Sequence, residues 1–343
     1  MRLKPYNTLL TIARQVKLFI TPARQTFAEL PQGAVPLWSE DFFGWCLNKF
    51  QNEPFPAPIT YNRVLRQLDE DAKAQSRNTV QPANLRTAFT NGGYTIDLGG
   101  PVVHITGKQW KILPPDTDEN RNVVFMRPIP SRPLPAPTHS DKKLKDHLSE
   151  AFAINEESAS KLGQWLELAL RPGQPCPTLV LTGELRDEAA EAIRQLIDPC
   201  SCPLFPFPGS RGEATWMALY NRVLAFPLYG TMSEFKRNLL RAFANGSFAA
   251  RLRQADGKLA ALTDFLKRPI ILTAESAPEI CRNQIAIEIK RCANLRQSEV
   301  LAALFDQMVE SLHNENAVPG PIPYKECCYT QHSTVAQPDA PIP

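Results

Sequence analysis

Short runs of alternating apolar and polar residues predict strands through the first third of the chain. Two strands are expected on either side of a turn at Thr21-Pro22, over residues 15–20 and 25–30, and a third candidate lies at 37–38. Turns that contain glycine then separate further alternating runs, which is the pattern of successive hairpins. These runs cover residues 85–90, 94–98, 102–105 and 110–112. The sequence therefore predicts an antiparallel meander after the first strands.

Two helices are expected between these groups of strands. Ser39 is a residue type that caps helix N-termini, and Glu40 and Asp41 follow it, so a helix is predicted from there through Phe50. A second helical run follows Ile59-Thr60, and its apolar positions share one face: Tyr61, Val64, Leu65 and Leu68. Helices and strands together predict an N-terminal α/β module with an antiparallel meander over residues 1–113.

The second half of the chain alternates amphipathic stretches with short apolar ones. Helices are predicted at residues 142–152, 157–170, 187–197, 213–220, 232–244 and 297–313. Strands are predicted at residues 178–182, 222–226, 269–273 and 285–289. This alternation favours a largely parallel sheet covered on both faces, which is a three-layer α/β domain over residues 141–313.

Proline marks the boundary between the two predicted domains. The 32 prolines are unevenly distributed, and a proline-rich linker covers residues 114–140, with one short strand predicted at 123–126. Residues 314–343 lack hydrophobic periodicity and are predicted to form a flexible tail.

At 343 residues, with 43% hydrophobic and 21% charged residues, the chain is long enough for two domains with cores of their own. The formal net charge of +3 is too small to indicate a nucleic-acid surface by itself. No apolar run approaches the roughly 20 residues of a membrane span, and the N-terminal stretch is amphipathic and unlike a signal peptide. A cytoplasmic location without a membrane partner is therefore expected.

The eight cysteines do not form a recognisable metal site. The two clusters are Cys200 with Cys202, and Cys327-Cys328 with His332. One residue separates Cys200 from Cys202 and none separates Cys327 from Cys328, whereas about two to four residues separate the paired cysteines of a structural zinc site. Unpaired thiols and no metal are expected.

Residues 177–199 have the order of elements that begins a phosphate-binding loop. A short apolar run ends in Thr182 and Gly183, and a helical pattern follows. Such a loop also requires a second glycine, a lysine for the β- and γ-phosphates and a hydroxyl for Mg²⁺. Counted from Gly183, these three positions hold Glu188, Ala189 and Ala190.

The start of this helix is acidic instead, with Asp187 among its carboxylates. Carboxylates stabilise the positive end of a helix dipole in the place where a phosphate would bind. We therefore expect a closed, self-neutralised turn without ATP or Mg²⁺, and leave open whether the side chains of Leu185 and Glu188 fill it. The degenerate nucleotide loop comprises Gly183, Glu184, Arg186 and Glu188, of which Arg186 is the one cation able to replace the lysine.

Several longer segments resemble the phage and integrative-element ATP-binding protein group, which is related to the helicase halves of primase-helicases with AAA+ type domains. The resemblance covers residues 10–312. It is carried by VKLFITPARQTFAEL and YTIDLGGPVVHITGKQWKIL in the first half, and by LGQWLELALRPGQPCPTLVLTGE, NRVLAFPLYG and KRPIILTA in the second. It implies that residues 141–313 form a three-layer P-loop NTPase-like, AAA+-like domain.

The resemblance also implies where further ATPase residues would lie. Members of the group end the strand equivalent to 222–226 with an acidic residue that holds Mg²⁺, but this chain has Pro227. Thr273 stands where a small amide sensor is usual, and the arginine that reaches a neighbouring subunit falls at Arg282 or one place later at Asn283. Thr273 and Arg282 are therefore candidate remnants of the sensor and the arginine finger. Joint loss of the lysine, the hydroxyl and the acidic residue predicts no hydrolysis of ATP.

Histidines offer few candidates for other chemistry. His104 lies between apolar neighbours in a predicted strand, where a packed or surface role is expected, and His139 and His147 are expected to be solvated. The chain has neither a serine framed as a nucleophile elbow nor a His-Glu-x-x-His pair. We therefore expect no catalytic residues.

One basic stretch is a candidate nucleic-acid contact. Residues 235–254 interleave aromatic side chains with five cations: Lys236, Arg237, Arg241, Arg251 and Arg253. This pattern is typical of a path for single-stranded DNA. It also fits the solvated face of an amphipathic helix, and both interpretations stay open.

The sequence as a whole predicts a non-hydrolysing AAA+/helicase-like protein of a mobile element or prophage. Its expected role is accessory or scaffolding, in DNA replication or maintenance, with single-stranded DNA or replication proteins as partners and a homo-oligomer as one form of assembly. One alternative is a divergent active ATPase or helicase that uses Arg186 for phosphate and Glu275 or Asp264 for the metal. Another is a decaying gene product without a selected activity.

Overall fold

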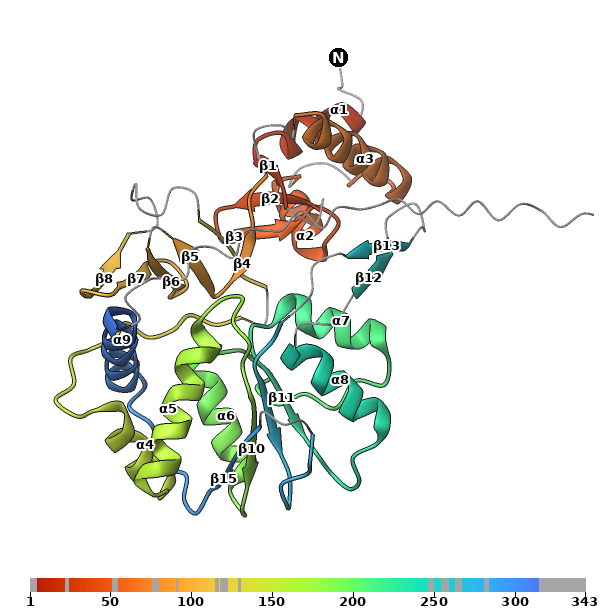
Figure 1. The fold of residues 1–343 in the computed structure, drawn as a ribbon. Helices are drawn as coiled ribbons and strands as arrows, with labels where there is room; N and C mark the ends of the chain where they lie inside the picture. Colours follow the sequence, from red (N-terminus) through yellow and green to blue (C-terminus); the bar gives the residue numbers. More distant parts are fainter. Residues whose placement is uncertain are drawn as a thin grey trace, which may run out of the picture.

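The computed structural model describes residues 5–21, 25–50, 55–75, 80–90, 92–114, 117, 123–128, 131–245, 250–253, 259–262, 267–280 and 284–314. Over these residues the protein is a mixed α/β structure with four separate β-sheets. Figure 1 shows the N-terminal helices at one end of the molecule, and a parallel sheet with its covering helices at the other.

The first sheet has five strands in the order β1-β2-β3-β9-β4. Its first three strands are antiparallel neighbours, whereas β9 lies between β3 and β4 and is parallel to both. The strands are β1 (Lys17–Ile20), β2 (Thr26–Leu30), β3 (Gly33–Pro36), β4 (Ala83–Leu85) and β9 (Val124–Met126). The strand expected in the proline-rich linker is thus confirmed as β9. The third strand predicted at 37–38 is wrong, because β3 ends at Pro36 and the chain turns there, with the Ser39 N–H donating to the Pro36 carbonyl.

Three helices pack on this sheet: α1 (Pro5–Ala13), α2 (Glu40–Lys49) and α3 (Pro58–Gln75). Ser39 caps α2 as predicted, since its Oγ accepts a hydrogen bond from the Phe42 N–H at 3.2 Å. The predicted apolar face of α3 is buried, and its members join the core with Ala28 and Val35 of the sheet: Tyr61, Val64, Leu65 and Leu68.

The second sheet is the predicted meander. Its strands are antiparallel in chain order: β5 (Thr87–Thr90), β6 (Gly93–Asp97), β7 (Val102–Thr106) and β8 (Trp110–Leu113). Arg86 interrupts the single strand expected at 85–90, because it adopts φ +60° and separates β4 from β5. Its buried guanidinium donates to the carbonyl oxygens of Asp97 at 3.1 Å and Arg132 at 2.8 Å, which holds this bend.

The third sheet consists of four parallel strands in the order β11-β14-β10-β15. They are β10 (Thr178–Thr182), β11 (Leu224–Pro227), β14 (Ile270–Thr273) and β15 (Gln284–Glu288). Each lies within about two residues of a strand predicted from the sequence. The fourth sheet is a hairpin of β12 (Ala250–Arg253) and β13 (Leu259–Leu262), which the sequence does not predict.

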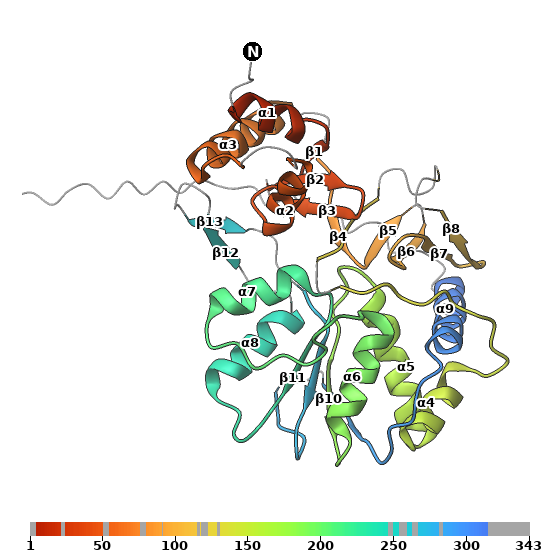
Figure 2. The same cartoon turned by 180° about the vertical axis from the view of Figure 1, so that it is seen from behind.

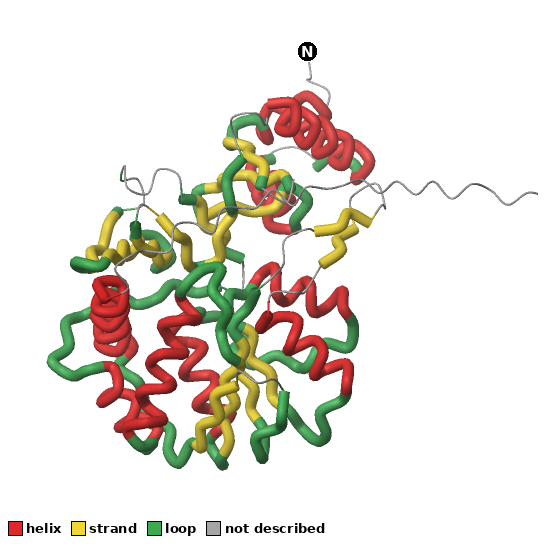
Figure 3. The backbone as a smooth tube through the Cα atoms, viewed as in Figure 1, coloured by secondary structure: helices red, strands yellow, loops and turns green. Residues whose placement is uncertain are grey.

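Helices cover both faces of the parallel sheet, as Figure 3 shows. Leu179 and Leu181 of β10 face one core, with α4 (Leu144–Phe152), α5 (Glu156–Leu170) and α6 (Arg186–Ile197). Val180 faces the opposite core, with α7 (Arg211–Tyr220) and α8 (Glu234–Asn245). Side chains in a strand point alternately to the two faces, so this apolar run is buried on both sides. The predicted three-layer arrangement is confirmed in this coarse sense.

Helix α9 (Gln297–Asn314) packs between the meander and helices α4 and α5, and Figures 1 and 2 both show it against β7 and β8. The Trp110 Nε1 donates to Asp306 Oδ1 at 2.8 Å, and the Trp110 and Phe305 rings lie 5.9 Å apart. One hydrophobic core includes residues of the meander, α9 and β10. No helix in the described part of the chain is both long and apolar enough to span a membrane.

Candidate functional site

The carboxyl ends of β10, β14 and β11 form one edge of the parallel sheet. In Figure 1 this edge lies at the end of the molecule remote from the N-terminal helices. Ligands of open parallel α/β sheets bind beyond this edge. The predicted nucleotide loop at Gly183, the strand end at Pro227 and the candidate sensor Thr273 are all located there.

The connection from β10 to α6 consists of three residues, 183–185. Gly183 has φ +99°, and a Cβ atom on it would lie 2.2 Å from the carbonyl oxygen of Ile289. The Ile289 N–H also donates to the Thr182 carbonyl at 2.8 Å. The turn is therefore held directly against the segment that follows β15. It is shorter than a loop whose backbone N–H groups surround a phosphate.

The residues predicted to form the nucleotide loop gather in this turn without forming a cradle. The Arg186 Nη1 donates to the Gly183 carbonyl at 3.0 Å, so this cation contacts its own turn. Glu184 and Glu188 are exposed, and Leu185 is 36% exposed. Leu185 and Glu188 therefore do not fill the turn, which is closed by the approach of two backbone segments.

Asp187, in the first turn of α6, lies beside the Gly183 turn. One of its carboxylate oxygens accepts a hydrogen bond from Thr273 Oγ1 at the end of β14. The other accepts from the Tyr229 hydroxyl at 3.4 Å. Asp187 thereby links the start of α6 to the end of β14 and to the segment that follows β11. The sequence identifies this carboxylate and Thr273 separately, and their contact requires the order of strands in the sheet.

The end of β11 is apolar. Pro227 is its last residue, and the N–H of Leu228 donates to the Thr273 carbonyl at 2.8 Å. Leu228 is 6% exposed and belongs to the core beneath α7 and α8. The residues that end this strand therefore offer no carboxylate for Mg²⁺ or for activation of water.

Of the residues of the alternative ATPase mechanism, the structure describes Arg186 and Glu275. Glu275 lies two residues beyond Thr273 and is exposed. Asp264, Arg282 and Asn283 lie outside the described residues. Their predicted roles stay predictions.

The basic stretch is divided by the fold. Arg237 and Arg241 line a cleft between α8 and the segment that follows β14, together with Glu234, Asn238 and Glu279. The Lys236 Nζ lies 5.0 Å from the centre of the Phe207 ring, outside this group. Arg251 and Arg253 belong to β12, which pairs with β13, while Phe248 lies outside the described residues. The nucleic-acid role of these residues stays a prediction.

Thiols and histidines define no second site in the described residues. Burial raises the pKa of Cys46 and of Cys176 to about 12. Within the same part of the chain, no group of three or more His, Cys, Asp or Glu side chains is arranged to hold a metal ion. The Cys327-Cys328 pair and His332 lie outside it.

The predicted exposure of His147 is wrong. The residue is 8% exposed, and its Nε2 lies 2.7 Å from Ser140 Oγ. Desolvation by burial is the main cause that lowers the pKa of His147. His104 is buried in the meander, with its Nδ1 3.3 Å from Thr95 Oγ1, which agrees with a packed strand residue.

The site and fold define a mixed α/β protein with a parallel sheet. No protein-family model matches the chain, and no curated protein matches it. Among solved structures, the apo A form of the C-terminal region of NrS-1 is similar, with TM-score 0.42 and 9% identity over 91% of this chain and 68% of that one. A second apo A form structure of that region, residues 305–718, has TM-score 0.38 and 9% identity over 93% and 68%. Similarities at this level support no functional assignment.

Proposed function

We propose that this chain is a P-loop NTPase-like, AAA+-like protein whose nucleotide site is closed. We propose further that it acts as a non-hydrolysing accessory or scaffold protein in DNA replication or maintenance of a mobile element or prophage. The observation that carries the proposal is the three-residue turn at Gly183. A polyphosphate needs several backbone N–H groups directed at it, and a three-residue turn held against Ile289 is shorter than the loop that supplies them in a P-loop.

Two further observations support a closed site. Asp187 places a negative charge at the start of α6, held by Thr273 and Tyr229, so a phosphate would meet a carboxylate there. Pro227 ends the strand from which an acidic residue would hold Mg²⁺. The link to mobile-element replication is supported by the resemblance of the sequence segments described above.

Calorimetric titration with Mg-ATP, combined with a phosphate-release assay, tests the absence of hydrolysis. We expect neither binding heat nor turnover at millimolar ATP. Arg186→Gln is the informative variant, and Arg211→Gln at the exposed start of α7 is its matched control. ATP turnover that is lost in Arg186→Gln and retained in Arg211→Gln would establish the active ATPase in place of this proposal.

The proposed DNA partner is tested separately, by fluorescence anisotropy of a labelled single strand at several salt concentrations. Contacts to phosphates predict an affinity that falls steadily as salt increases. Absence of binding at low salt would remove DNA from the proposal and leave a protein scaffold. Sedimentation of the same samples determines whether the chain assembles with itself.

A further inference from the structure

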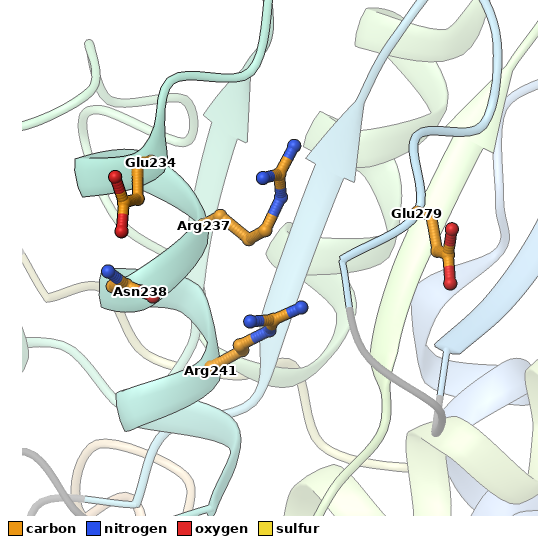
Figure 4. Close-up of a pocket in the computed structure, with 5 residues that line it drawn as sticks. All are labelled: Glu234, Arg237, Asn238, Arg241 and Glu279. Carbon is orange, nitrogen blue, oxygen red and sulfur yellow. The ribbon is translucent and has the colours of Figure 1, made fainter.

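We propose that the cleft between α8 and residues 274–280 binds a single phosphate group through Arg237 and Arg241. The inference does not depend on the closed turn at Gly183, with which this cleft shares no residue, although Arg237 and Arg241 are two of the residues predicted to contact DNA. The cleft has a volume of about 490 Å³, which is large enough for a phosphate and the group that carries it. Figure 4 shows both arginines extending from α8 toward the segment that carries Glu279.

The environment of the Arg237 guanidinium is the principal observation. This guanidinium makes no hydrogen bond or ion pair with the residues that the structure describes, although its Nε is shielded from solvent. A buried donor without a partner is costly, and native proteins satisfy nearly all such groups. The Nη atoms of Arg237 are not among the shielded atoms, and Arg237 lines the cleft. An anion in the cleft that accepts hydrogen bonds from these Nη atoms compensates for the desolvation of the guanidinium.

Arg241 is positioned beside it by the fold. It follows Arg237 by four residues on the same helix, so the two side chains lie on one face, one turn apart. The Arg241 Nε donates to the Ile280 carbonyl at 2.6 Å, which fixes the orientation of the guanidinium. Its two Nη atoms make no other hydrogen bond among the described residues and remain as donors for a ligand.

The chemistry of the cleft favours a phosphate over other anions. Two guanidinium groups and the Asn238 amide supply more donors than the two oxygens of a carboxylate can accept, whereas a phosphate offers three or four oxygens. Glu234 and Glu279 line the same cleft, and neither forms an ion pair with the arginines in the described part of the chain. The charges of these two carboxylates offset those of the arginines, so the cleft lacks the net positive charge that holds a nucleic-acid backbone, and we expect one phosphate group, free or at the end of a strand, to bind through its hydrogen bonds to the guanidinium groups.

Arg237→Gln is the decisive variant, because this guanidinium makes no hydrogen bond or ion pair with the residues that the structure describes. Lys236→Gln is the matched control: it removes the same charge from the adjacent position, where the ammonium lies over Phe207. Arg241→Gln is less suitable, since it also removes the bond to Ile280.

Binding of inorganic phosphate to the full chain is measured by titration calorimetry and by the rise in melting temperature. We expect saturable binding to the parent and to Lys236→Gln, and at least a tenfold loss of affinity in Arg237→Gln. Phosphate also stabilises proteins by exclusion from their surface, but that effect would be equal in all three proteins. Equal stabilisation of all three, or no saturable binding to the parent, would overturn the proposal.

A second arm identifies the source of the phosphate. A single-stranded oligonucleotide with a 5′-phosphate is compared with the same strand without it, in the parent and in Arg237→Gln. Tighter binding of the phosphorylated strand to the parent alone supports the site and assigns it to a strand end. If calorimetry shows that phosphate binds, but both strands bind equally and phosphate competes with neither, the ligand of the site is a free phosphate.

Discussion

Gly183 is the residue at which the conformation of the backbone decides the chemistry of the site. Its positive φ and its contact with Ile289 are both allowed because it lacks a side chain. Phosphate-binding loops also have a glycine at this position, but here the glycine allows the end of β10 to pack closely against the segment that follows β15. The residue type alone therefore does not distinguish a cradle from a closed turn.

Substitution of Gly183 by alanine should destabilise the protein by about 3 kcal/mol or more, since strained backbone and a clash with a carbonyl oxygen act together. Gly230→Ala is the control, because Gly230 also has a positive φ, +78°, with nothing within 4 Å of an added Cβ. The Gly230→Ala variant should lose about 1 kcal/mol of its free energy of unfolding. Urea unfolding measures both; equal losses would show that the approach of Ile289 is not what restricts this position.

Single residues of the site could be identified from the sequence to different extents. The absence of the lysine, the hydroxyl and the acid follows from spacing alone, and Thr273 is located by its place after an apolar run. The pairing of Asp187 with Thr273 could not be predicted, because 86 residues separate them and the contact depends on β14 lying beside β10. Likewise, only the structure shows that the Arg237 guanidinium has no hydrogen-bond partner among the described residues.

At the scale of elements, hydrophobic periodicity was sufficient to predict most helices and strands of the described chain. The α2 cap at Ser39, the buried face of α3 and the four parallel strands follow from local patterns. The pairing of strands did not follow, and β9 shows why. Its three residues come from a proline-rich linker and yet join two distant strands, and such non-local pairing leaves no local signal.

Helix α4 provides a test based on pH. Burial lowers the pKa of His147 in the folded protein, whereas the unfolded chain binds a proton near the ordinary value of about 6.5. The unfolded state therefore binds more protons as pH falls below that value, so stability should decrease between about pH 7 and pH 5. His147→Gln should reduce this slope, and His139→Gln, at an exposed histidine, should leave it unchanged. Urea unfolding at several pH values measures the slope of stability against pH. Parallel curves for the parent and His147→Gln would show that His147 is not the source of this slope.

At the scale of the whole molecule, the two predicted domains share interior contacts. Asp198 follows α6, and its Oδ2 accepts the backbone N–H groups of Arg222 and Val223, each at 2.9 Å. Its Oδ1 lies 3.6 Å from the Nε of Arg86, which separates the first sheet from the meander. This carboxylate thus connects the start of the meander to the parallel sheet, in addition to the core that includes α9.

We expect the described body of the protein to unfold in one cooperative transition. Asp198→Ala should lower the temperature of that whole transition. The substitution leaves two buried N–H groups and a guanidinium without this acceptor, which should cost about 3 kcal/mol. Asp141→Ala, at a carboxylate with 99% side-chain exposure, is the control and should cause no measurable change. Scanning calorimetry compares the calorimetric and van't Hoff enthalpies. Two resolved transitions, with only one displaced by Asp198→Ala, would show that the halves unfold independently.

The position of α9 determines how the chain can be shortened for experiments. A truncation within the proline-rich linker would remove the meander and leave the apolar side chains of α9 that pack on it in water, among them Phe305. Exposed apolar surface of this kind promotes aggregation. Fragments intended for crystallisation or for separate assays should therefore retain the meander and α9 together, although the proline content of the linker predicts a domain boundary between them.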